Sequence, residues 1–344
     1  MQDEGRARSL SIVVPVYRSE ETLPELHRRV TAVLDDFAQE YEVILVDDGS
    51  DDGSWQAIRN LVEQDPRVRG IRLCRNAGQH NALLCGIRAA RYPVTVTLDD
   101  DLQNPPEEIP ALFAALDEGH DVVYGAPLRE QHGFLRDLAS RLTKIALQDV
   151  MGSENARHVS AFRAFRTRLR DAFADYSNPF VSIDVLLTYG TDRFGHVQVR
   201  HDPRSAGRSS YTLRKLVVHA MNMMTGFTNI PLQLASLAGF FCSLLGVLVL
   251  AYVLFTYLTQ GSVVPGFAFL ASMVAIFSGV QLFALGIVGE YLGRIHVSTL
   301  ARPPYLVRDH AGDPGVEREP TAGDPAVDRA RTDRERVSSR PGGS

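Results

Sequence analysis

Three consecutive aspartates, at positions 99 to 101, follow a short apolar run in the N-terminal half of the chain. Asp99 and Asp101 are two residues apart, so in an extended segment both side chains point to one side and that of Asp100 to the other. Acidic residues also favour the boundary between a strand and a turn. However, two carboxylates that leave room for water and phosphate oxygens commonly hold Mg²⁺ or Mn²⁺ beside a diphosphate. The spacing therefore favours a metal site of Asp99, Asp101 and Gln103, which shares their parity.

A second acidic stretch, Asp-Asp-Gly-Ser-Asp-Asp-Gly-Ser, begins at Asp47 and superficially resembles a calcium loop. A calcium loop starting there would need a bidentate Glu at its twelfth position, which is Ile58. Asp47 is better suited to accept a hydrogen bond from a nucleotide base or ribose. We expect Asp51 or Ser54 to cap the following helix. Further on, Arg75 follows a strand and could contact phosphate, although a solvated arginine is the commoner case.

These residues lie at the ends of predicted strands. Over the first ~215 residues, β-branched runs alternate with helical periodicity, which predicts an α/β domain with a mostly parallel sheet. The predicted strands are 11–16, 42–46, 68–73 and 94–98, and the predicted helices are 23–37, 55–64 and 81–90. Ligands of such sheets bind beyond the carboxyl ends of the strands. The sequence has neither a Gly-x-x-x-x-Gly-Lys-Ser/Thr phosphate loop nor a Gly-x-Gly-x-x-Gly fingerprint, so metal and arginine would hold a pyrophosphate.

A long stretch without charge, from residue 216 to 289, predicts membrane-spanning helices. A span needs roughly 20 apolar residues, and the stretch divides into 232–258 and 267–288 at the polar Thr259 to Ser262. The alternative is a pair of helices buried in a soluble core, but core helices usually carry a polar stripe. Basic residues flank both ends of the stretch, so the positive-inside rule places both flanks, and the catalytic domain, on the cytoplasmic side of the inner (plasma) membrane.

The remaining segments complete the predicted domain organisation. The charged residues 1–8 form an N-terminal arm, and the apolar run behind them is too short for a signal peptide. Residues 9–210 form the catalytic domain, 211–229 a juxtamembrane amphipathic helix, 230–290 the two-span hairpin and 291–308 a cytoplasmic membrane-proximal segment. Residues 309–344 have few large apolar side chains and are expected to be disordered. The three cysteines have no metal-binding spacing, and the net charge of −5 is mild.

Four motifs, taken in order, resemble the family 2 glycosyltransferases of GT-A fold, and in particular the dolichol- or polyprenyl-phosphate sugar transferases. They are Val14-Pro-Val-Tyr17, Val46-Asp-Asp-Gly-Ser50, Arg75-Asn-Ala-Gly78 and Leu98-Asp-Asp-Asp-Leu-Gln-Asn-Pro-Pro-Glu107. The resemblance continues through the segment 204–211, the two spans and Gly289-Glu-Tyr-Leu-Gly-Arg294. It implies a GT-A domain, Rossmann-like with a mostly parallel sheet, followed by interfacial helices and two transmembrane helices. It also implies Mg²⁺ or Mn²⁺ as cofactor, a nucleotide-sugar donor and a polyprenyl phosphate acceptor.

The resemblance also implies roles for individual residues. Pro15 and Tyr17 would line the nucleotide pocket, Asp47 would contact the base, and Arg75 and Asp100 would belong to the same binding site. Asp99, Asp101 and Gln103 would serve the metal. The phosphate and acceptor site would consist of Arg204, Arg208 and Ser209. The residues expected to act in catalysis are Asp101, Asp184 and Arg204.

Several positions depart from the family's pattern. Arg18-Ser19 replaces the usual Asn-Glu, and Ala161 replaces an Asp sometimes proposed as the base, for which Asp184 is a candidate substitute. A base is dispensable if the acceptor is a phosphomonoester, because its second pKa of about 6 leaves it largely anionic near neutral pH. Arg129 is a candidate to compensate for an arginine that relatives carry after Tyr-Gly. The expected reaction is direct displacement by lipid phosphate with inversion, feeding cell-envelope glycan synthesis.

Three further functions compete with this expectation. A processive polysaccharide synthase usually carries Gln-x-x-Arg-Trp near the membrane, whereas the only tryptophan here is Trp55. The second competing function is a transferase that uses a glycan or protein acceptor, and the third is a catalytically silent lipid-phosphate-binding protein. No nucleic-acid partner is expected. Gly239, Gly246 and Gly279 could permit close helix approach in a homo-oligomer. The sugar and the nucleotide depend on pocket shape, which the motifs do not specify.

Overall fold

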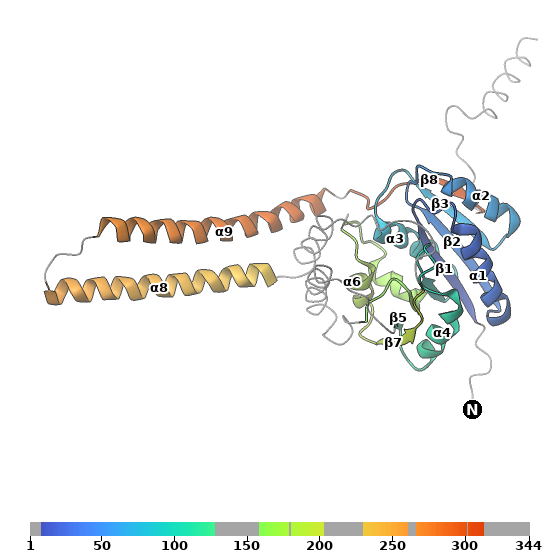
Figure 1. The fold of residues 1–344 in the computed structure, drawn as a ribbon, viewed down its shortest axis with the longest axis horizontal. Helices are drawn as coiled ribbons and strands as arrows, with labels where there is room; N and C mark the ends of the chain where they lie inside the picture. The colour runs from blue at the N-terminus through green and yellow to red at the C-terminus, as the bar shows by residue number, and fades with distance from the viewer. Residues whose placement is uncertain are drawn as a thin grey trace, which may run out of the picture.

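The computed structural model describes residues 8–127, 158–178, 180–202, 230–260, 266–300 and 302–312. An α/β domain is built on one eight-stranded sheet, and a long helical hairpin projects from it (Figure 1). The strands are β1 (Ser9–Val16), β2 (Glu40–Asp47), β3 (Val68–Leu73), β4 (Val94–Thr97), β5 (Val122–Pro127), β6 (Arg163–Arg166), β7 (Phe194–Val199) and β8 (Val307–Ala311). The helices are α1 (Leu23–Phe37), α2 (Ser54–Gln64), α3 (Gln79–Ala89), η1 (Pro106–Glu108), α4 (Ile109–Asp117), η3 (Thr167–Phe173), α6 (Ile183–Thr188), α8 (Ile230–Gln260) and α9 (Phe267–Thr299).

The strand order is β7-β5-β6-β4-β1-β2-β3-β8, and its central strands β4, β1, β2 and β3 are parallel. In the register Val16 lies beside Asp47, and Val13 lies beside Thr97. The carboxyl ends of β1, β2 and β4 therefore meet at one edge of the sheet, as parallel pairing requires. Strand β6 runs antiparallel to β4 and β5, and β8 runs antiparallel to β3. The prediction of a mostly parallel α/β domain is confirmed.

Both faces of the central sheet are covered, which explains why β1 is an almost uninterrupted apolar run. Every residue of β1 is buried. Leu10, Ile12, Val14 and Val16 belong to one core cluster with the buried residues of α1 and α4, whereas Val13 belongs to a second cluster with α3 and α6. The alternation along β1 thus separates two apolar layers and holds the strand ends at a fixed place between them.

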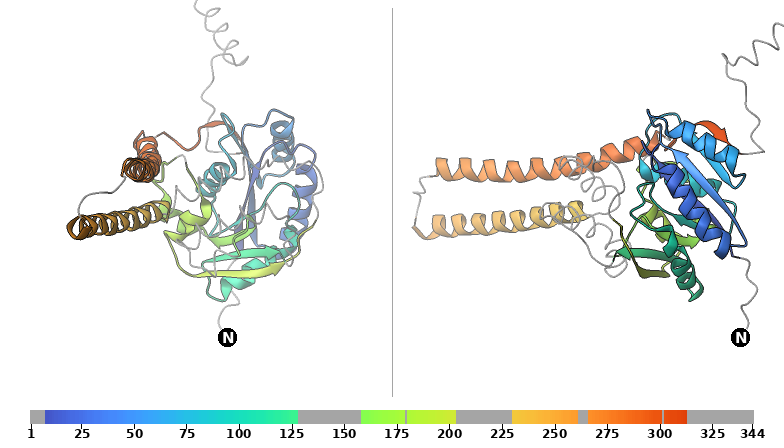
Figure 2. Two further views of the ribbon diagram at one scale, coloured as in Figure 1. Left: turned by 60° about the vertical axis from the view of Figure 1, so that its left-hand side comes forward. Right: turned by 45° about the vertical axis from the view of Figure 1, so that its right-hand side comes forward.

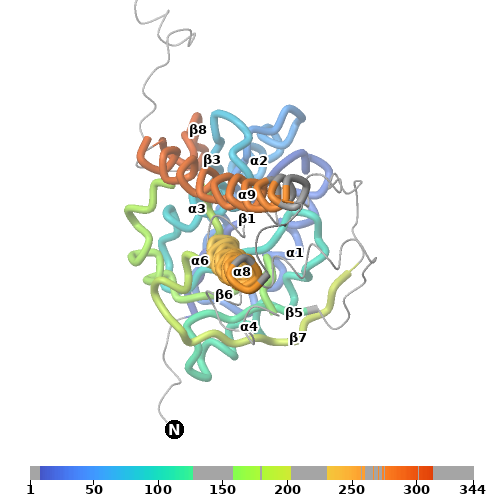
Figure 3. Tube along the Cα trace, turned by 90° about the vertical axis from the view of Figure 1, so that its left-hand side faces the viewer, coloured from blue at the N-terminus to red at the C-terminus, as the bar shows by residue number. Residues whose placement is uncertain are grey.

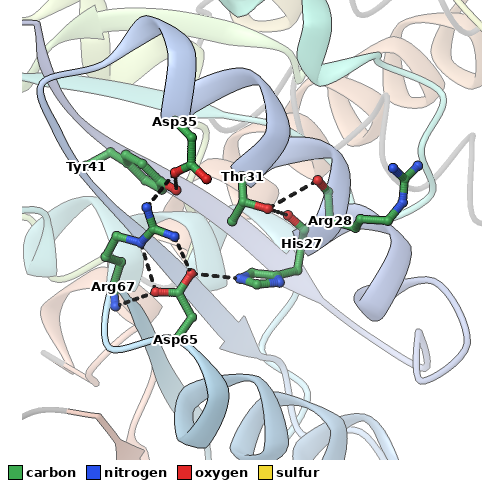
Figure 4. A network of polar contacts seen from close by, with 7 residues as sticks. All are labelled: His27, Arg28, Thr31, Asp35, Tyr41, Asp65 and Arg67. Carbon is green, nitrogen blue, oxygen red and sulfur yellow. Dashed lines mark hydrogen bonds and ion pairs between the residues drawn. The ribbon is translucent and has the colours of Figure 1, made fainter.

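A polar network at the amino end of the strands holds α1 against the sheet (Figure 4). Asp65, just before β3, accepts hydrogen bonds from Arg67 at 2.9 Å and lies 3.1 Å from His27 of α1. Arg67 and Tyr41 both donate to Asp35 of α1 at 2.6 Å. Burial alone would raise the pKa of Asp65, but hydrogen bonds from Arg67 and His27 outweigh it and lower the pKa to about 2.

The two apolar helices form an antiparallel hairpin that extends away from the domain (Figures 1 and 2). Viewed along the hairpin, α8 and α9 lie in front of the sheet (Figure 3). The segments Pro231–Thr256 and Ile276–Thr299 are long and apolar enough to cross a membrane. A Cβ added at Gly246 of α8 would lie 3.3 Å from the ring of Phe277 in α9, so the glycine permits close packing. The predicted spans fall within these helices, but α9 continues beyond 288 to Thr299.

The segment after the hairpin returns to the sheet. Residues Val307–Ala311 form β8, in which Asp309 lies beside Arg72 and His310 beside Ile71 of β3. The prediction that the chain is disordered from Asp309 is therefore wrong for residues 309–312. This strand has charged residues and no apolar pattern, as is common at a sheet edge, so composition alone did not reveal it. The predicted helix at 211–229 and the tail beyond 312 lie outside the described residues.

Candidate active site

The three predicted metal-site aspartates lie directly after β4 in a tight turn. Strand β4 ends at Thr97, Asp100 and Asp101 are in a turn, and Leu102 has a φ of 60°. The expectation of an extended segment is therefore wrong, and strict alternation of side chains does not apply. Asp99 accepts a hydrogen bond from the side chain of Gln79 at 2.6 Å, and Asp101 accepts one from the backbone N–H of Gln103 at 3.1 Å.

The middle carboxylate joins this turn to the end of β1. Asp100 accepts a hydrogen bond from the backbone N–H of Tyr17 at 3.1 Å and another from the hydroxyl of Ser19. Burial raises the pKa of Asp100, while the hydrogen bonds from Ser19 and Tyr17 act in the opposite direction. Two predicted nucleotide-site residues, Tyr17 and Asp100, are thus brought together, whereas Pro15 is buried within β1.

Arg18, the first residue of the Arg18-Ser19 pair that departs from the family pattern, contacts both Asp51 and Tyr17. Arg18 has a φ of 56°, forms two hydrogen bonds of 2.6 Å to Asp51, and lies 5.4 Å from the ring centroid of Tyr17. Tyr17 as a whole residue remains 44% exposed, so a ligand could reach it. A positive φ at a non-glycine residue persists where surrounding contacts enforce it. The two hydrogen bonds to Asp51 are such contacts. Because both oxygens of Asp51 accept from Arg18, Asp51 is not the helix cap that was predicted.

The cap of α2 comes from other residues than expected. The helix begins at Ser54 after Gly53, and no side chain of the N-cap residue makes a capping hydrogen bond. Glu20 accepts a hydrogen bond from the N–H of Gly53 at 3.0 Å, and Asp52 accepts one from the N–H of Ser54 at 3.1 Å. The loop after β1 is therefore fastened to the start of α2 by side chains distant in sequence.

The carboxylate of Asp47 lies at the end of β2. Its side chain is fully buried, with one oxygen accepting from the N–H of Ser50 at 2.9 Å and the other 3.2 Å from Nε of Arg72. The contact with Arg72 is an ion pair by distance, but its geometry is not that of a hydrogen bond. Asp47 therefore organises the loop after β2 through one oxygen, while its other oxygen accepts no hydrogen bond, and its contact with a base stays a prediction.

Sequence reasoning missed its neighbour, Asp48. The two oxygens of Asp48 accept hydrogen bonds from the backbone N–H groups of Ala77 at 2.7 Å and Gly78 at 2.9 Å. Burial raises the pKa of Asp48 to about 6, although both hydrogen bonds act to lower it. The carboxylate thus clamps the turn after β3 to the end of β2. The paired aspartates were a signal, but nothing in the sequence distinguished the two.

A close backbone approach brings Arg75 to the same edge. Gly49 has a φ of 68°, and a Cβ there would lie 2.6 Å from the carbonyl carbon of Arg75. The side chain of Arg75 is exposed. The loops after β1, β2, β3 and β4 therefore meet at one edge, where the aspartates and Arg75 could bind a nucleotide diphosphate.

Asp184, the suggested substitute base, has a different environment. It lies in α6, is 6% exposed, pairs with the guanidinium of Arg163 and accepts a hydrogen bond from Tyr124 at 3.0 Å. A buried carboxylate that neutralises a buried arginine stabilises the interior and is poorly placed to take a proton from a substrate. Its geometry therefore contradicts the predicted catalytic role.

The predicted acceptor-phosphate residues Arg204, Arg208 and Ser209, together with Arg129, lie outside the described residues. The described chain leading to that segment is placed, however. The N–H of Asp202 donates to the carbonyl oxygen of Gln103 at 2.9 Å. The described chain therefore reaches the carboxylate turn at Asp202.

The chain thus combines an α/β domain that gathers carboxylates at its strand ends with two helices long and apolar enough to cross a membrane. The model of Glycosyl transferase family 2 matches residues 11–176, and the chain belongs to this family. The recognition of the family, and of the chain as a glycosyltransferase, is confirmed.

Two of the similar curated proteins share a name. The undecaprenyl-phosphate 4-deoxy-4-formamido-L-arabinose transferase of Aeromonas hydrophila is 36% identical over 301 residues, which cover 87% of this chain and 92% of the relative. The protein of that name from Shewanella sediminis is 37% identical over 87% of this chain and 92% of its own length. A glucosyl-3-phosphoglycerate synthase from Mycobacterium tuberculosis, in complex with Mn²⁺, UDP and glucosyl-3-phosphoglycerate, has a TM-score of 0.47 and 21% identity over 63% of this chain and 78% of its own.

Proposed function

We propose that this glycosyltransferase moves a sugar from a nucleotide-sugar to polyprenyl phosphate, undecaprenyl or decaprenyl, at the cytoplasmic face of the inner membrane. The observation that carries the proposal is the set of strand-end carboxylates in a domain that is followed in the chain by a membrane-length hairpin. The names of the relatives, which match along both the domain and the hairpin, support polyprenyl phosphate as the acceptor.

Asp99 and Asp101 are the residues that would hold the divalent metal, Mg²⁺ or Mn²⁺. Among the described residues there is no group of three or more His, Cys, Asp or Glu side chains that could hold a metal ion. A pair of carboxylates nevertheless fits Mg²⁺, which commonly takes one or two carboxylates and completes its shell with water and phosphate oxygens. When bound, such a metal stabilises the negative charge of the departing nucleoside diphosphate. The backbone N–H of Gln103 orients Asp101 for this role.

The nucleotide would bind along the edge formed by the four loops. The exposed Tyr17 offers a stacking surface for the base, and Asp100 holds the backbone that carries its ring. Arg75 would meet the diphosphate from the turn that Asp48 clamps.

The acceptor phosphate would be held by Arg204, Arg208 and Ser209, with Arg204 nearest to the reacting atoms. A phosphomonoester has a second pKa of about 6, so it is already a nucleophilic anion near neutral pH. Direct attack on the anomeric carbon then inverts its configuration, the bond to the nucleoside diphosphate breaks, and no protein base is needed. Pairing of Asp184 with Arg163 agrees with a mechanism of this kind.

The topology follows from the hairpin and its flanks. Two spans return the chain to the side on which it began, so the domain and both termini would be cytoplasmic. A homo-oligomer through the spans is compatible with Gly239 and Gly279, where an added Cβ would meet nothing within 4 Å.

The test is transfer from a panel of radiolabelled nucleotide-sugars to polyprenyl phosphate in membranes, with Mg²⁺ or with EDTA. Metal-dependent label in the lipid phase is expected for the wild type and for Asp117→Ala, a surface control, but not for Asp101→Ala. Label found in glycan or protein instead of lipid would show that the acceptor is a glycan or protein and not polyprenyl phosphate. Failure of every donor to bind in the presence of metal would favour the catalytically silent lipid-phosphate-binding protein.

A further inference from the structure

The cytoplasmic end of α9 contacts the catalytic domain through an arginine and an aromatic ring. The guanidinium carbon of Arg294 lies 4.9 Å from the ring centroid of Phe180. Arg294 also donates to Glu290, one helical turn earlier, at 3.0 Å. Its side chain is only 14% exposed, while the neighbouring large apolar residues Leu292 and Ile295 are 64% and 57% exposed. This end of the helix therefore contacts the domain, whereas most large apolar residues of the hairpin are exposed among the described residues.

The segment that carries Phe180 is connected to the metal-site turn through the first residues of α3. Three residues after Phe180, the backbone N–H of Ile183 donates to Nδ1 of His80 in α3 at 3.3 Å. The residue before His80 is Gln79, whose side chain donates to Asp99 at 2.6 Å. Two hydrogen bonds and a few residues of chain thus connect the end of the membrane helix with a metal-site carboxylate.

A second set of contacts fixes the chain on the other side of this helix end. Tyr305 packs against α3, where Arg88 approaches its hydroxyl at 3.4 Å, and the N–H of Cys74 donates to the carbonyl oxygen of Leu306 at 2.8 Å. Strand β8 follows and pairs with β3. The chain is therefore fixed to the domain at two places, within the last turns of α9 and directly after the helix ends. Both places lie on the side of the domain that carries α3 (Figure 1).

We propose that Phe180 and Arg294 are positioning residues that set the height of the metal-site turn above the membrane surface, so that a membrane-embedded polyprenyl phosphate reaches the bound donor. The inference rests on the proposed function. A lipid phosphate cannot leave the interface, so its productive encounter depends on this distance, whereas a soluble nucleotide-sugar diffuses to its site from any direction. Loss of the contact should consequently affect the acceptor and spare the donor.

The experiment uses the full chain in proteoliposomes that contain polyprenyl phosphate, with Arg294→Ala, Phe180→Ala and the double variant. A contact of this kind corresponds to roughly a 3- to 30-fold change in an equilibrium constant. We expect kcat/KM for the lipid acceptor to fall by that factor and the Kd for the nucleotide-sugar to stay within about twofold. Phe180→Tyr, which keeps the ring, should behave like the wild type. The double variant should be no worse than either single one.

Arg8→Ala provides a matched control, because Arg8 lies at the same 4.9 Å from the ring of Phe37 at the amino end of β1. It should leave both constants unchanged. Parallel loss of donor affinity and acceptor turnover, additive effects in the double variant, or unchanged acceptor kinetics would each overturn the inference.

Amide hydrogen exchange separates this inference from the proposed function. The N–H of Ile183 should exchange faster in Arg294→Ala than in the wild type or in Arg8→Ala. If the wild type transfers no sugar to polyprenyl phosphate, the proposed function fails. If, in addition, the exchange rate at Ile183 is the same in Arg294→Ala as in the wild type, the positioning role of the contact fails as well. If the wild type transfers no sugar to polyprenyl phosphate but Ile183 exchanges faster in Arg294→Ala, the positioning role stands and the acceptor is a different membrane molecule.

Discussion

Arg163 and Asp184 form an ion pair inside the domain, with only 2% and 8% of their side-chain surfaces exposed. Replacing Asp184 by Ala would leave the arginine charge buried without its carboxylate, and we expect a loss of about 3–5 kcal/mol in the free energy of unfolding. Thermal unfolding of the detergent-solubilised protein measures this loss. A general base would behave differently: Asp184→Asn would then keep its stability and lose sugar transfer, and that result would restore the catalytic role.

Replacement of either metal-site carboxylate should abolish metal-dependent donor binding. Asp101→Ala removes a ligand from a site that has only one other carboxylate, Asp99, so sugar transfer should fall by roughly 10²- to 10³-fold. Titration of nucleotide binding with Mn²⁺ provides the measurement, with EDTA as the reference. Asp117→Ala should match the wild type. Metal-dependent binding that persists in Asp101→Ala would move the metal site elsewhere.

Two glycines with positive φ should respond differently to alanine. Gly78 has a φ of 96° and a ψ of 150°, a region that essentially only glycine adopts, and open space around an added Cβ, so Gly78→Ala should cost only backbone strain of about 1–3 kcal/mol. Gly49→Ala adds a clash with the backbone of Arg75 at 2.6 Å and should cost more. It should also weaken nucleotide binding, because the loop after β2 must move. Equal stability of the two variants would contradict the close approach.

Stability should decrease as pH rises through the titration of Asp48. The folded-state pKa of about 6 lies above the value of about 3.9 for an unfolded Asp, so the folded state binds its proton more tightly. Between about pH 4 and pH 6 the free energy of unfolding should therefore fall, by up to roughly 3 kcal/mol. Asp48→Asn should lack this slope. Unfolding followed by the fluorescence of the single Trp55 provides the measurement.

Asp65 should show the opposite pH dependence. Its folded-state pKa of about 2 lies below the unfolded value of about 3.9, so its contribution is present above about pH 4 and is lost as pH falls towards 2. Because solvent partly screens this group, the loss should be well below the roughly 3 kcal/mol that the full pKa shift corresponds to. The difference between the wild type and Asp65→Asn, measured by acid unfolding, isolates this group. A wild type and variant that lose stability in parallel would exclude the network of Figure 4 as the cause.

The sequence predicted the central strands and helices well because their apolar runs record burial directly. Helix α1 and strand β3 begin and end at the predicted residues, and both contribute apolar side chains to covered faces of the sheet. The same pattern located the strand ends and hence the edge on which the candidate site lies.

What the sequence did not reveal depends on contacts between distant segments. The ion pair of Asp47 requires Arg72 of β3, and the clamp made by Asp48 requires the turn at Ala77 and Gly78, about 30 residues away. The contact of Asp184 with Arg163 requires α6 to pack beside β6. Strand β8 gains its stability from backbone pairing with β3, which leaves no periodic signal in its own side chains. Residue types suggested the chemistry at these positions, but only packing assigned each residue its role.

The return of the chain to β3 also sets an order of events during synthesis. A ribosome must pass both α8 and α9 before it makes β8, so the outer edge of β3 has no partner from β8 while the hairpin enters the membrane. An unpaired strand edge is prone to pairing with other chains. The sheet therefore receives its outer strand only after both helices of the hairpin have been synthesised, so a chain that stops within the hairpin would leave that edge of β3 without β8.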